Sequence, residues 1–291
     1  MKKIAILGCE NSHTDAFLKA IRENEAYRDV EVVGIYSNEP EATKRLSEQF
    51  SVPVLENYAD AVGKIDGLII TARNGENHYR YAKPYIESGI PMFIDKPITN
   101  SEEEAVAFMR ELLAHGVRFC GGSSLKQDGT VAQLKADRLA ETGGKTLGGY
   151  VRAPYDKESE YGGFFFYAQH LVEMVGEIFG RHPLTVTARE NGDHIHVLFH
   201  YEDYDCVGLY CNEKYKYFVS RISETTSDAF TILSAASKEW FAKEFQEYYE
   251  LLSGGEQQID PKDFIVPVFV MNAIVRSLKS GKEEAIGAIE I

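Results

Sequence analysis

Fully apolar runs alternate with amphipathic segments from the start of the chain to Cys120. After Lys3, the run at 3–8 is apolar, which is typical of a strand buried on both faces of a sheet. After a polar loop, apolar residues around Phe17 recur at helical spacing. The alternation repeats about every 20 residues, which predicts βαβ units and a parallel, doubly wound sheet. Strands are expected at 3–8, 30–36, 52–55, 67–71, 91–94 and 117–120, and helices at 39–50 (capped by Ser37-Asn38), 58–62, 78–88 and 101–115.

Gly121-Gly122-Ser123-Ser124 ends this alternation and is the expected domain boundary. Beyond it, several strands follow one another without helices between them, a pattern that favours a largely antiparallel sheet. Strands are expected at 146–152, 184–190, 194–201, 206–212, 217–222 and 229–234, and helices at 131–141, 164–179, 240–252 and 264–278. We therefore expect an α/β domain over residues 1–121 and an α+β domain with an open sheet over residues 122–291. The last helix can pack back on the first domain.

The charge balance restricts the partners of the protein. The 31 basic and 45 acidic side chains give a net charge of −14, so nucleic acid is an unsuitable partner. The four cysteines have no metal-ligand or disulfide-framework spacing and indicate reduced thiols of a cytoplasmic protein. The apolar run after Met1-Lys2-Lys3 is shorter than the roughly 7–15 residues of a signal sequence. No run approaches the ~20 residues of a membrane span, and we expect a small-molecule ligand.

The expected strand at 91–94 leads directly into Asp95-Lys96-Pro97. Proline donates no amide hydrogen bond and restrains the residue before it, so Lys96 should lie at an extended corner. Ligands of parallel sheets bind beyond the carboxyl ends of the strands, where this corner is expected. On local sequence alone, a solvated lysine at a strand end is the simpler interpretation, and a catalytic lysine is the alternative.

Several motifs in this order resemble the glucose–fructose oxidoreductase / inositol dehydrogenase / MocA (Gfo/Idh/MocA) family of NAD(P)-dependent oxidoreductases. Asp95-Lys96-Pro97 is similar to the family's Glu-Lys-Pro, and Gly162-Gly163 precedes His170 by seven residues. The resemblance implies a Rossmann dinucleotide-binding domain followed by an α+β domain on an open antiparallel sheet. It also implies NAD or NADP as cofactor, a sugar or polyol substrate, and a homo-oligomer formed through the second sheet.

The resemblance implies a catalytic group built on Lys96 and His170. In the family, the lysine orients the substrate hydroxyl, while an aspartate and a histidine four residues apart on one helix face provide acid–base function. Here the aspartate position holds Phe166. Glu173, one turn beyond His170, could orient the imidazole instead. The expected catalytic residues are Lys96, His170 and Glu173, and the expected substrate-binding residues are Lys96, Lys126, Tyr167 and His170, with Tyr161 as another hydroxyl donor.

The loop after the first strand departs from the Rossmann fingerprint. Only Gly8 follows the strand, and Glu10 stands where the second glycine is expected. A carboxylate facing a pyrophosphate is unfavourable. Two interpretations follow: Glu10 turns away and the amides of Asn11, Ser12 and His13 bind the phosphates, or dinucleotide binding is weakened or lost.

The end of the second strand leaves the choice between NAD and NADP open. NAD-binding chains place an acid there, and NADP-binding chains offer a nearby Arg, but this chain has Ser37-Asn38. Thr71 and Asn74, after a later strand, could pack against the nicotinamide ribose, and the equally good alternative is a polar loop that caps the next helix. The expected cofactor-binding residues are Gly8, Glu10, Asn11, Ser12, His13, Ser37, Asn38, Thr71, Asn74, Asp95 and Lys96.

Three histidines share one face of an expected strand: His194, His196 and His200. They spread over ~20 Å, too far for one ion, so we expect no metal and assign them to an exposed or subunit-contacting face. The leading hypothesis is thus an NAD(P)-dependent oxidoreductase. The alternative, motivated by Glu10 and Phe166, is a catalytically silent relative that binds a small molecule or regulates a partner.

Overall fold

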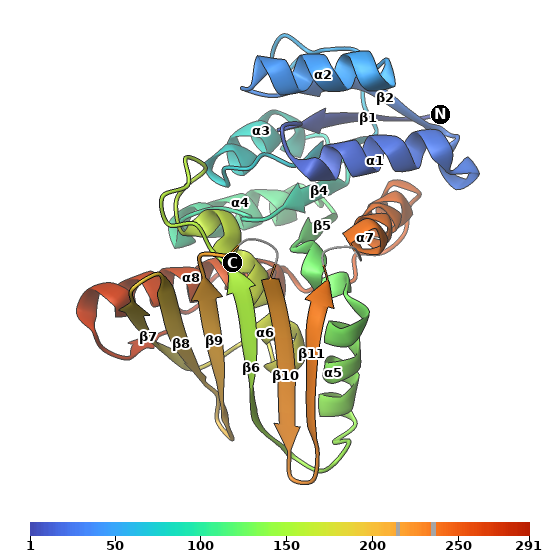
Figure 1. Ribbon diagram of the computed structural model, residues 1–291. Helices are drawn as coiled ribbons and strands as arrows, with labels where there is room; N and C mark the ends of the chain where they lie inside the picture. Colours follow the sequence, from blue (N-terminus) through green and yellow to red (C-terminus); the bar gives the residue numbers. More distant parts are fainter. Residues whose placement is uncertain (214–215, 234–236) are drawn as a thin grey trace.

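The chain forms two β-sheets, one in each half. The computed structural model describes residues 1–213, 216–233 and 237–291. The first sheet has five strands and the second has seven, and the two stand one beyond the other with helices around them (Figure 1). Every strand of the first sheet is parallel to its neighbours, and the second sheet is mostly antiparallel. The predicted fold class is therefore confirmed.

The first sheet places the carboxyl ends of its central strands side by side. Its strand order is β2-β1-β3-β4-β5, so β1 and β4 flank β3. All of these strands precede Ser123, and the four longer helices of this half follow β1, β2, β3 and β4 in turn. The elements are β1 (Lys2–Leu7), α1 (Ser12–Glu23), β2 (Val30–Tyr36), α2 (Pro40–Phe50), β3 (Gly67–Ile70), α3 (Glu76–Ile86), β4 (Met92–Asp95), α4 (Glu102–Ala114) and β5 (Phe119–Gly122).

Two expected elements between β2 and β3 are wrong. The strand at 52–55 is reduced to a single bridge between Val54 and Ile35. The helix at 58–62 is a series of turns, because the side chain of Asn57 accepts a hydrogen bond from the amide of Ala59 at 2.9 Å and Asp60 accepts one from the amide of Asn57 at 2.8 Å. Such side-chain to backbone bonds compete with helix formation.

The expected cap of α2 is also wrong. The helix begins at Pro40, and Glu39 precedes it without a side-chain capping bond. The hydroxyl of Ser37 accepts a hydrogen bond from the amide of Glu39 at 3.0 Å, before the helix starts. Pro40 sets the start instead, because its fixed φ suits the first helical position.

The second sheet has the order β11-β10-β6-β9-β8-β7-β12. Its pairs are antiparallel except β6 with β9, which are parallel. The chain connects these two strands through α6, β7 and β8. The strand expected at 229–234 corresponds to β11, and its last residue lies outside the described residues. The strands are β6 (Thr146–Pro154), β7 (Thr185–Asn191), β8 (His194–His200), β9 (Asp205–Cys211), β10 (Lys216–Ser223), β11 (Ser227–Leu233) and β12 (Glu284–Ala285).

Helices cover one face of this sheet. α5 (Gly129–Leu139), α6 (Phe165–Phe179) and α8 (Pro261–Ser280) lie behind the strands as Figure 1 shows them. Inward-facing strand residues such as Val197 and Val219 pack against α6 in one apolar core. In the part of the chain that the structure describes, the opposite face carries no helix.

The two C-terminal helices return to the first domain. From α7 (Ser237–Leu252), Phe245 and Tyr248 join the core formed by β1 and α1, where Phe245 lies 5.4 Å from Phe17 between ring centroids. The first half of α8 contributes Phe264 and Phe269 to the core on the other face of the first sheet. This packing holds the carboxyl edge of the first sheet against the second domain, where the candidate site lies.

Candidate active site

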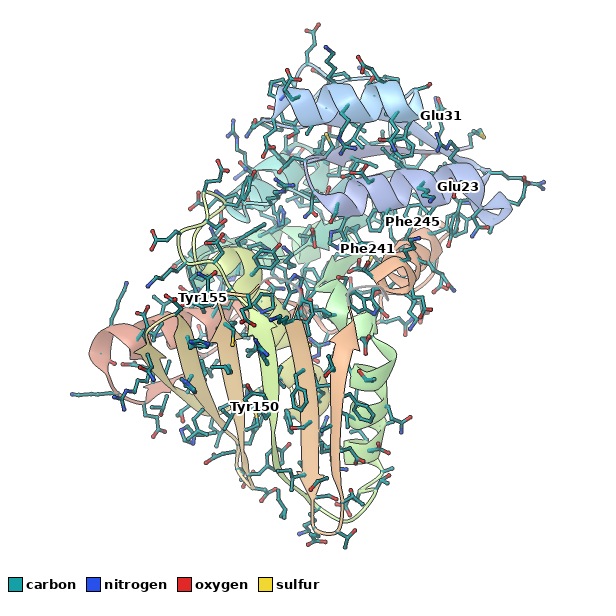
Figure 2. The ribbon with its side chains drawn as sticks, in the orientation of Figure 1. Glu23, Glu31, Tyr150, Tyr155, Phe241 and Phe245 are labelled. Atoms are coloured by element: carbon teal, nitrogen blue, oxygen red, sulfur yellow. The ribbon has the colours of Figure 1, made fainter. Side chains whose placement is uncertain are left out.

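A cavity of about 710 Å³ lies between the two domains. The first domain contributes the N-terminus of α1, the loop after β3 and Lys96 at the end of β4. The second domain contributes α6, α7 and a loop after β6; Figure 2 shows Phe241 and Phe245 on α7 beside the first domain. The cavity is lined by Asn11, Ser12, His13, Arg73, Lys96, Ser124, Leu125, Asp156, Glu158, Ser159, Glu160, Tyr161, Phe166, Tyr167, His170, Tyr217, Ser237, Trp240 and Phe241.

Lys96 points into this cavity and is held by aromatic rings. Its side chain is only 4% exposed, and Nζ donates a hydrogen bond to the carbonyl oxygen of Phe166 at 3.2 Å. Nζ also lies 4.7 Å from the ring centroid of Phe166 and 5.3 Å from that of Tyr167. Burial lowers the pKa of Lys96, although Asp95 opposes this shift. Phe166, which stands at the position of the motif's aspartate, therefore covers the amine with its aromatic ring.

His170 lies on α6 and lines the same cavity. Its Nδ1 is 2.6 Å from the hydroxyl oxygen of Ser123, and this oxygen accepts a hydrogen bond from the amide of Leu125 at 3.3 Å. We assign the hydroxyl proton of Ser123 to the bond with Nδ1, which places the imidazole proton on Nε2. Burial lowers the pKa of His170 well below its ordinary value, so the ring is neutral at neutral pH.

Ser123 was missed by sequence reasoning, and it takes the place expected for Glu173. The carboxylate of Glu173 accepts hydrogen bonds from the amide of Ser123 at 3.3 Å and from Gln169 at 2.9 Å, so it holds the Ser123 backbone. Gly122 permits this approach, because a Cβ there would lie 2.5 Å from Glu173 Oε1. The only signal was the Gly-Gly-Ser-Ser segment, which was interpreted as a domain boundary alone.

Lys126 lies in a different cavity from Lys96 and His170. This second space, of about 350 Å³, is shared with residues of α5, α6 and α8, including Lys135 and Arg181. Lys126 Nζ donates to the carbonyl oxygen of Gly121. Burial lowers the pKa of Lys126, but the carboxylates of Glu247 and Glu173 outweigh this effect and raise it. The structure therefore does not bring Lys126 to the substrate position that the resemblance implied, whereas Tyr167 does line the main cavity.

The loop after β1 leaves the N-terminus of α1 open to the cavity. Gly8 has φ of +79°, and a Cβ there would lie 2.2 Å from the amide nitrogen of Ala72, so the two loops approach too closely for any side chain. Asn11 caps α1 by accepting a hydrogen bond from the amide of His13. Asn11, Ser12 and His13 all line the cavity. A helix N-terminus that faces open space fits the pyrophosphate of a dinucleotide.

Glu10 turns away from this N-terminus. Its Oε2 accepts a hydrogen bond from the hydroxyl of Ser37 at 2.7 Å, and its Oε1 accepts one from the amide of Arg73 at 2.9 Å. The carboxylate thus bridges the carboxyl ends of β2 and β3, above the end of β1. Of the two interpretations of Glu10, the structure matches the first in its geometry.

Three other expected cofactor ligands hold loops in place. The hydroxyl of Thr71 lies 2.9 Å from that of Thr14 and donates to the carbonyl oxygen of Gly8 at 3.1 Å. Asn74 accepts a hydrogen bond from the amide at the start of α3 at 3.1 Å. Asn38 is exposed and accepts one from the Tyr36 hydroxyl at 2.9 Å.

Asp95 lies beneath the loop after β1, here called the phosphate loop, in a buried cluster with Asn11, His13 and Glu244. Asn11 Nδ2 donates to Asp95 Oδ2 at 2.7 Å, and His13 Nδ1 lies 3.3 Å from the same oxygen. On its other side, His13 Nε2 lies 3.2 Å from Oε2 of Glu244, which was not identified from the sequence. Burial raises the pKa of Asp95 to about 6 and that of Glu244 well above its ordinary value, and it lowers the pKa of His13. The cluster ties β4, the phosphate loop and α7 together.

A loop of the second domain closes over the cavity. The hydroxyl of Tyr161 accepts a hydrogen bond from Arg73 Nη1 at 2.8 Å and donates one to Glu39 Oε1 at 3.0 Å. The Arg73 guanidinium also lies 5.0 Å from the centroid of the Tyr161 ring. This contact joins the second domain to the ends of β2 and β3.

The histidines of β8 form no metal site. His194 and His196 are exposed, and His200 Nδ1 lies 2.9 Å from Asp205 Oδ1. No group of three or more metal-ligating side chains occurs in the described ranges of the chain. No helix within those ranges is long and apolar enough to cross a membrane.

The first domain matches a known family in sequence. Residues 2–122 match the Gfo/Idh/MocA model, which describes an oxidoreductase family with an NAD-binding Rossmann fold. These residues contain the whole five-stranded sheet and Lys96. No curated protein sequence matches the chain significantly.

Solved structures match the chain over almost its full length. One is a myo-inositol dehydrogenase from Corynebacterium glutamicum, with a TM-score of 0.83, 16% identity and 99% of each chain covered. Another is GenD2 from gentamicin A biosynthesis in complex with NAD, with a TM-score of 0.85, 14% identity, and 99% of this chain and 97% of that chain covered. A third is scyllo-inositol dehydrogenase from Lactobacillus casei with bound NAD(H) and scyllo-inositol, with a TM-score of 0.84, 14% identity, and 99% of this chain and 100% of that chain covered. The structural likeness establishes the fold, and the first domain, over residues 2–122, matches the model of the Gfo/Idh/MocA oxidoreductase family.

Proposed function

We propose that the protein is an NAD(P)-dependent oxidoreductase that acts on a carbinol group of a polyol, a sugar or a related hydroxylated small molecule. The observation that carries this proposal is the meeting of Lys96 and His170, from different domains, in one cavity with the N-terminus of α1. Similar structures hold NAD or NAD(H), and one also holds scyllo-inositol, which supports the same ligand classes here.

Lys96 and His170 have complementary roles in this proposal. Lys96 donates a hydrogen bond to the substrate oxygen and favours the negative charge that develops on it. When a carbonyl is reduced, His170 first takes a second proton at Nδ1 and becomes an imidazolium. Its Nε2 proton then passes to the substrate oxygen, which leaves a neutral ring whose Nδ1 donates to the Ser123 oxygen. In the opposite direction Nε2 of that neutral ring accepts the hydroxyl proton, and the imidazolium releases one proton to solvent. When bound, the nicotinamide exchanges the hydride, and Asn11, Ser12 and His13 hold the pyrophosphate.

A catalytically silent binding or regulatory protein is the second candidate. It is favoured by Phe166, whose ring and carbonyl oxygen both engage Lys96 Nζ in place of a carboxylate. The two candidates differ in cofactor binding and turnover.

A thermal-shift titration with NAD(H) and NADP(H) separates the two candidates. A dinucleotide that binds the native state raises its stability by RT ln(1 + [L]/Kd), so the enzyme should show a rising melting temperature. No stabilisation at millimolar dinucleotide would exclude the oxidoreductase. If stabilisation occurs, a polyol and sugar panel read by nicotinamide absorbance identifies the substrate class.

We also propose that two copies of the chain associate through the open face of the second sheet, in the cytosol. Neighbouring strands present partly buried apolar side chains on that face, including Leu198, Leu209 and Phe218. The four free cysteines agree with a reducing compartment. Light scattering should give twice the monomer mass for the native chain and the monomer mass for Leu209→Glu, whereas a monomeric native chain would exclude this association.

A further inference from the structure

Proteins with a Rossmann fold distinguish NAD from NADP at the end of the second strand. An acid at that point accepts hydrogen bonds from the ribose hydroxyls of NAD, and it repels the 2′-phosphate of NADP. In this chain, β2 ends at Tyr36 and the next residue is Ser37, which carries no charge. The structure nevertheless supplies a carboxylate at this place from another part of the chain.

That carboxylate belongs to Glu10. Its Oε2 is 2.7 Å from the Ser37 hydroxyl oxygen, so it lies one hydrogen bond from the end of β2. Its Oε1 is fixed by the amide of Arg73 at 2.9 Å. Each carboxylate oxygen has a further lone pair, so two contacts leave capacity for a pair of hydroxyl groups.

Glu10 also lies between two open spaces. Arg73 lines the main cavity of about 710 Å³. Ser37 lines a separate cavity of about 420 Å³ between β2 and α2. Glu10 is hydrogen-bonded to one residue of each space, and in an extended dinucleotide the nicotinamide half would occupy the first space and the adenosine half the second.

The charges around Glu10 favour a neutral diol over a phosphate. Glu39 adds a second carboxylate near the same strand end. Its Oε1 accepts a hydrogen bond from the Tyr161 hydroxyl at 3.0 Å. The nearby cations are Arg73, whose guanidinium is engaged by the hydroxyl and ring of Tyr161, and Lys44. Lys44 lines the cavity of about 420 Å³ together with Glu48 and Glu56. A 2′-phosphate at this place would therefore face more carboxylates than cations.

We propose that Glu10 is the carboxylate that binds the adenosine ribose hydroxyls, and that with Glu39 it restricts the enzyme to NAD. The acid that the fold normally carries at the end of β2 has moved to the phosphate loop. This inference rests on the proposed function and narrows its cofactor from NAD(P) to NAD.

Calorimetric titration of the full chain with NADH and NADPH tests this inference. The native protein should bind NADH at least ~30-fold more tightly than NADPH. Glu10→Gln should weaken NADH binding roughly 10–100-fold, the range for losing a hydrogen bond to a charged group, and should not weaken NADPH binding. Glu41→Gln, an exposed change of equal charge on α2, should leave both affinities unchanged.

A rescue variant separates ligand binding from loop damage. In Glu10→Gln combined with Ser37→Asp, an acid returns to the strand end, and the preference for NADH should return. Tighter NADH binding by Glu10→Gly would overturn the inference, because Glu10 would then be an obstacle. A native preference for NADPH, or no change in Glu10→Gln, would also overturn it and leave the proposed function standing. Absence of binding by both dinucleotides would refute both.

Discussion

The substrate end and the cofactor end of the main cavity differ in the side chains that surround them. At the substrate end, Lys96 and His170 are buried among aromatic rings, and their pKa values are lowered. At the cofactor end, Glu10 bridges two strands, and Asp95 and Glu244 enclose His13. The substrate end places a lysine and a histidine against aromatic side chains, whereas the cofactor end is built on hydrogen-bonded or buried carboxylates.

This contrast shows what each end requires. Proton transfer at the substrate end needs groups whose charge can change near neutral pH, and desolvation brings a lysine towards that range. At the cofactor end, Glu10 and Asp95 accept hydrogen bonds and burial raises the pKa of Glu244, so these side chains fix the loop after β1. The predictions below alter one end and ask whether the other end responds.

Removing the amine at the substrate end should have the largest effect. Lys96→Ala should lower kcat/KM about 10³-fold, the scale of losing one acid–base group, because the substrate oxygen loses its hydrogen-bond donor. Steady-state kinetics on the identified polyol measures this loss. The affinity for dinucleotide should change much less than turnover, since the expected pyrophosphate contacts are made by the N-terminus of α1. Lys83→Ala, an exposed change on α3, is the control, and unchanged turnover in Lys96→Ala would remove Lys96 from the mechanism.

Gly8→Ala should damage the cofactor end. The added Cβ would meet the backbone of Ala72 at 2.2 Å, and φ of +79° is strained for alanine. We expect a loss of roughly 1–3 kcal/mol in the free energy of unfolding and weaker dinucleotide binding. Denaturant unfolding and calorimetry measure both. Gly63→Ala, also at positive φ but with open space around its Cβ, isolates the clash from the strain, and equal losses in the two variants would contradict the close approach.

Glu244→Gln should change how stability depends on pH. Burial raises the folded pKa of Glu244 well above its unfolded value, so the native state retains a proton that the unfolded state releases. The stability of the native protein is therefore complete below the unfolded pKa and falls as pH rises, by about 1.4 kcal/mol per pH unit until the folded pKa is reached. Glutamine does not titrate, so the stability of the variant relative to the native protein should increase as pH rises from the ordinary pKa of a glutamate into the neutral range.

Denaturant unfolding across this pH range measures the gain. A difference that shrinks as pH rises would contradict this prediction and would mean that Glu244 is ionised against a protonated His13. Glu239→Gln, at an exposed position in the first turn of α7, should show no such trend.

Ser123→Ala should have the smallest effect and reports the His170 tautomer. Loss of the orienting hydroxyl should lower kcat about tenfold, as for other partners that orient a functional imidazole. A hydroxyl that donates to Nδ1 stabilises the neutral ring, so its removal should raise the pKa of His170 and move the acidic limb of the pH–rate profile upward. Ser123→Thr should restore both, and a downward shift would show that Nδ1 carries the proton instead.

Much of the fold could be predicted because local pattern and tertiary structure agree. The apolar run after Lys3 corresponds to the part of β1 that is buried on both faces, and uninterrupted strands near His194 correspond to the antiparallel part of the second sheet. The errors lie at 52–62, where Asn57 and Asp60 bond to the backbone and form turns. Apolar periodicity does not report such side-chain bonds.

A site residue could be predicted only where the sequence immediately around it forms a recognisable strand end or motif. Lys96 follows a buried strand and precedes a proline, so its position could be deduced. Ser123 and Glu244 act through contacts with His170 and His13, which lie far from them in sequence, and these contacts exist only after the domains have packed. Lys126 shows the converse: it has a plausible position in the motif, but its side chain turns to another cavity.

A crystal structure with NADH and a polyol bound tests the central claim most directly. The account predicts a dinucleotide with its pyrophosphate at the N-terminus of α1 and its nicotinamide beside Lys96 and His170, with a substrate hydroxyl within hydrogen-bond reach of both side chains. A dinucleotide bound outside the main cavity, or a polyol that contacts neither side chain, would contradict it.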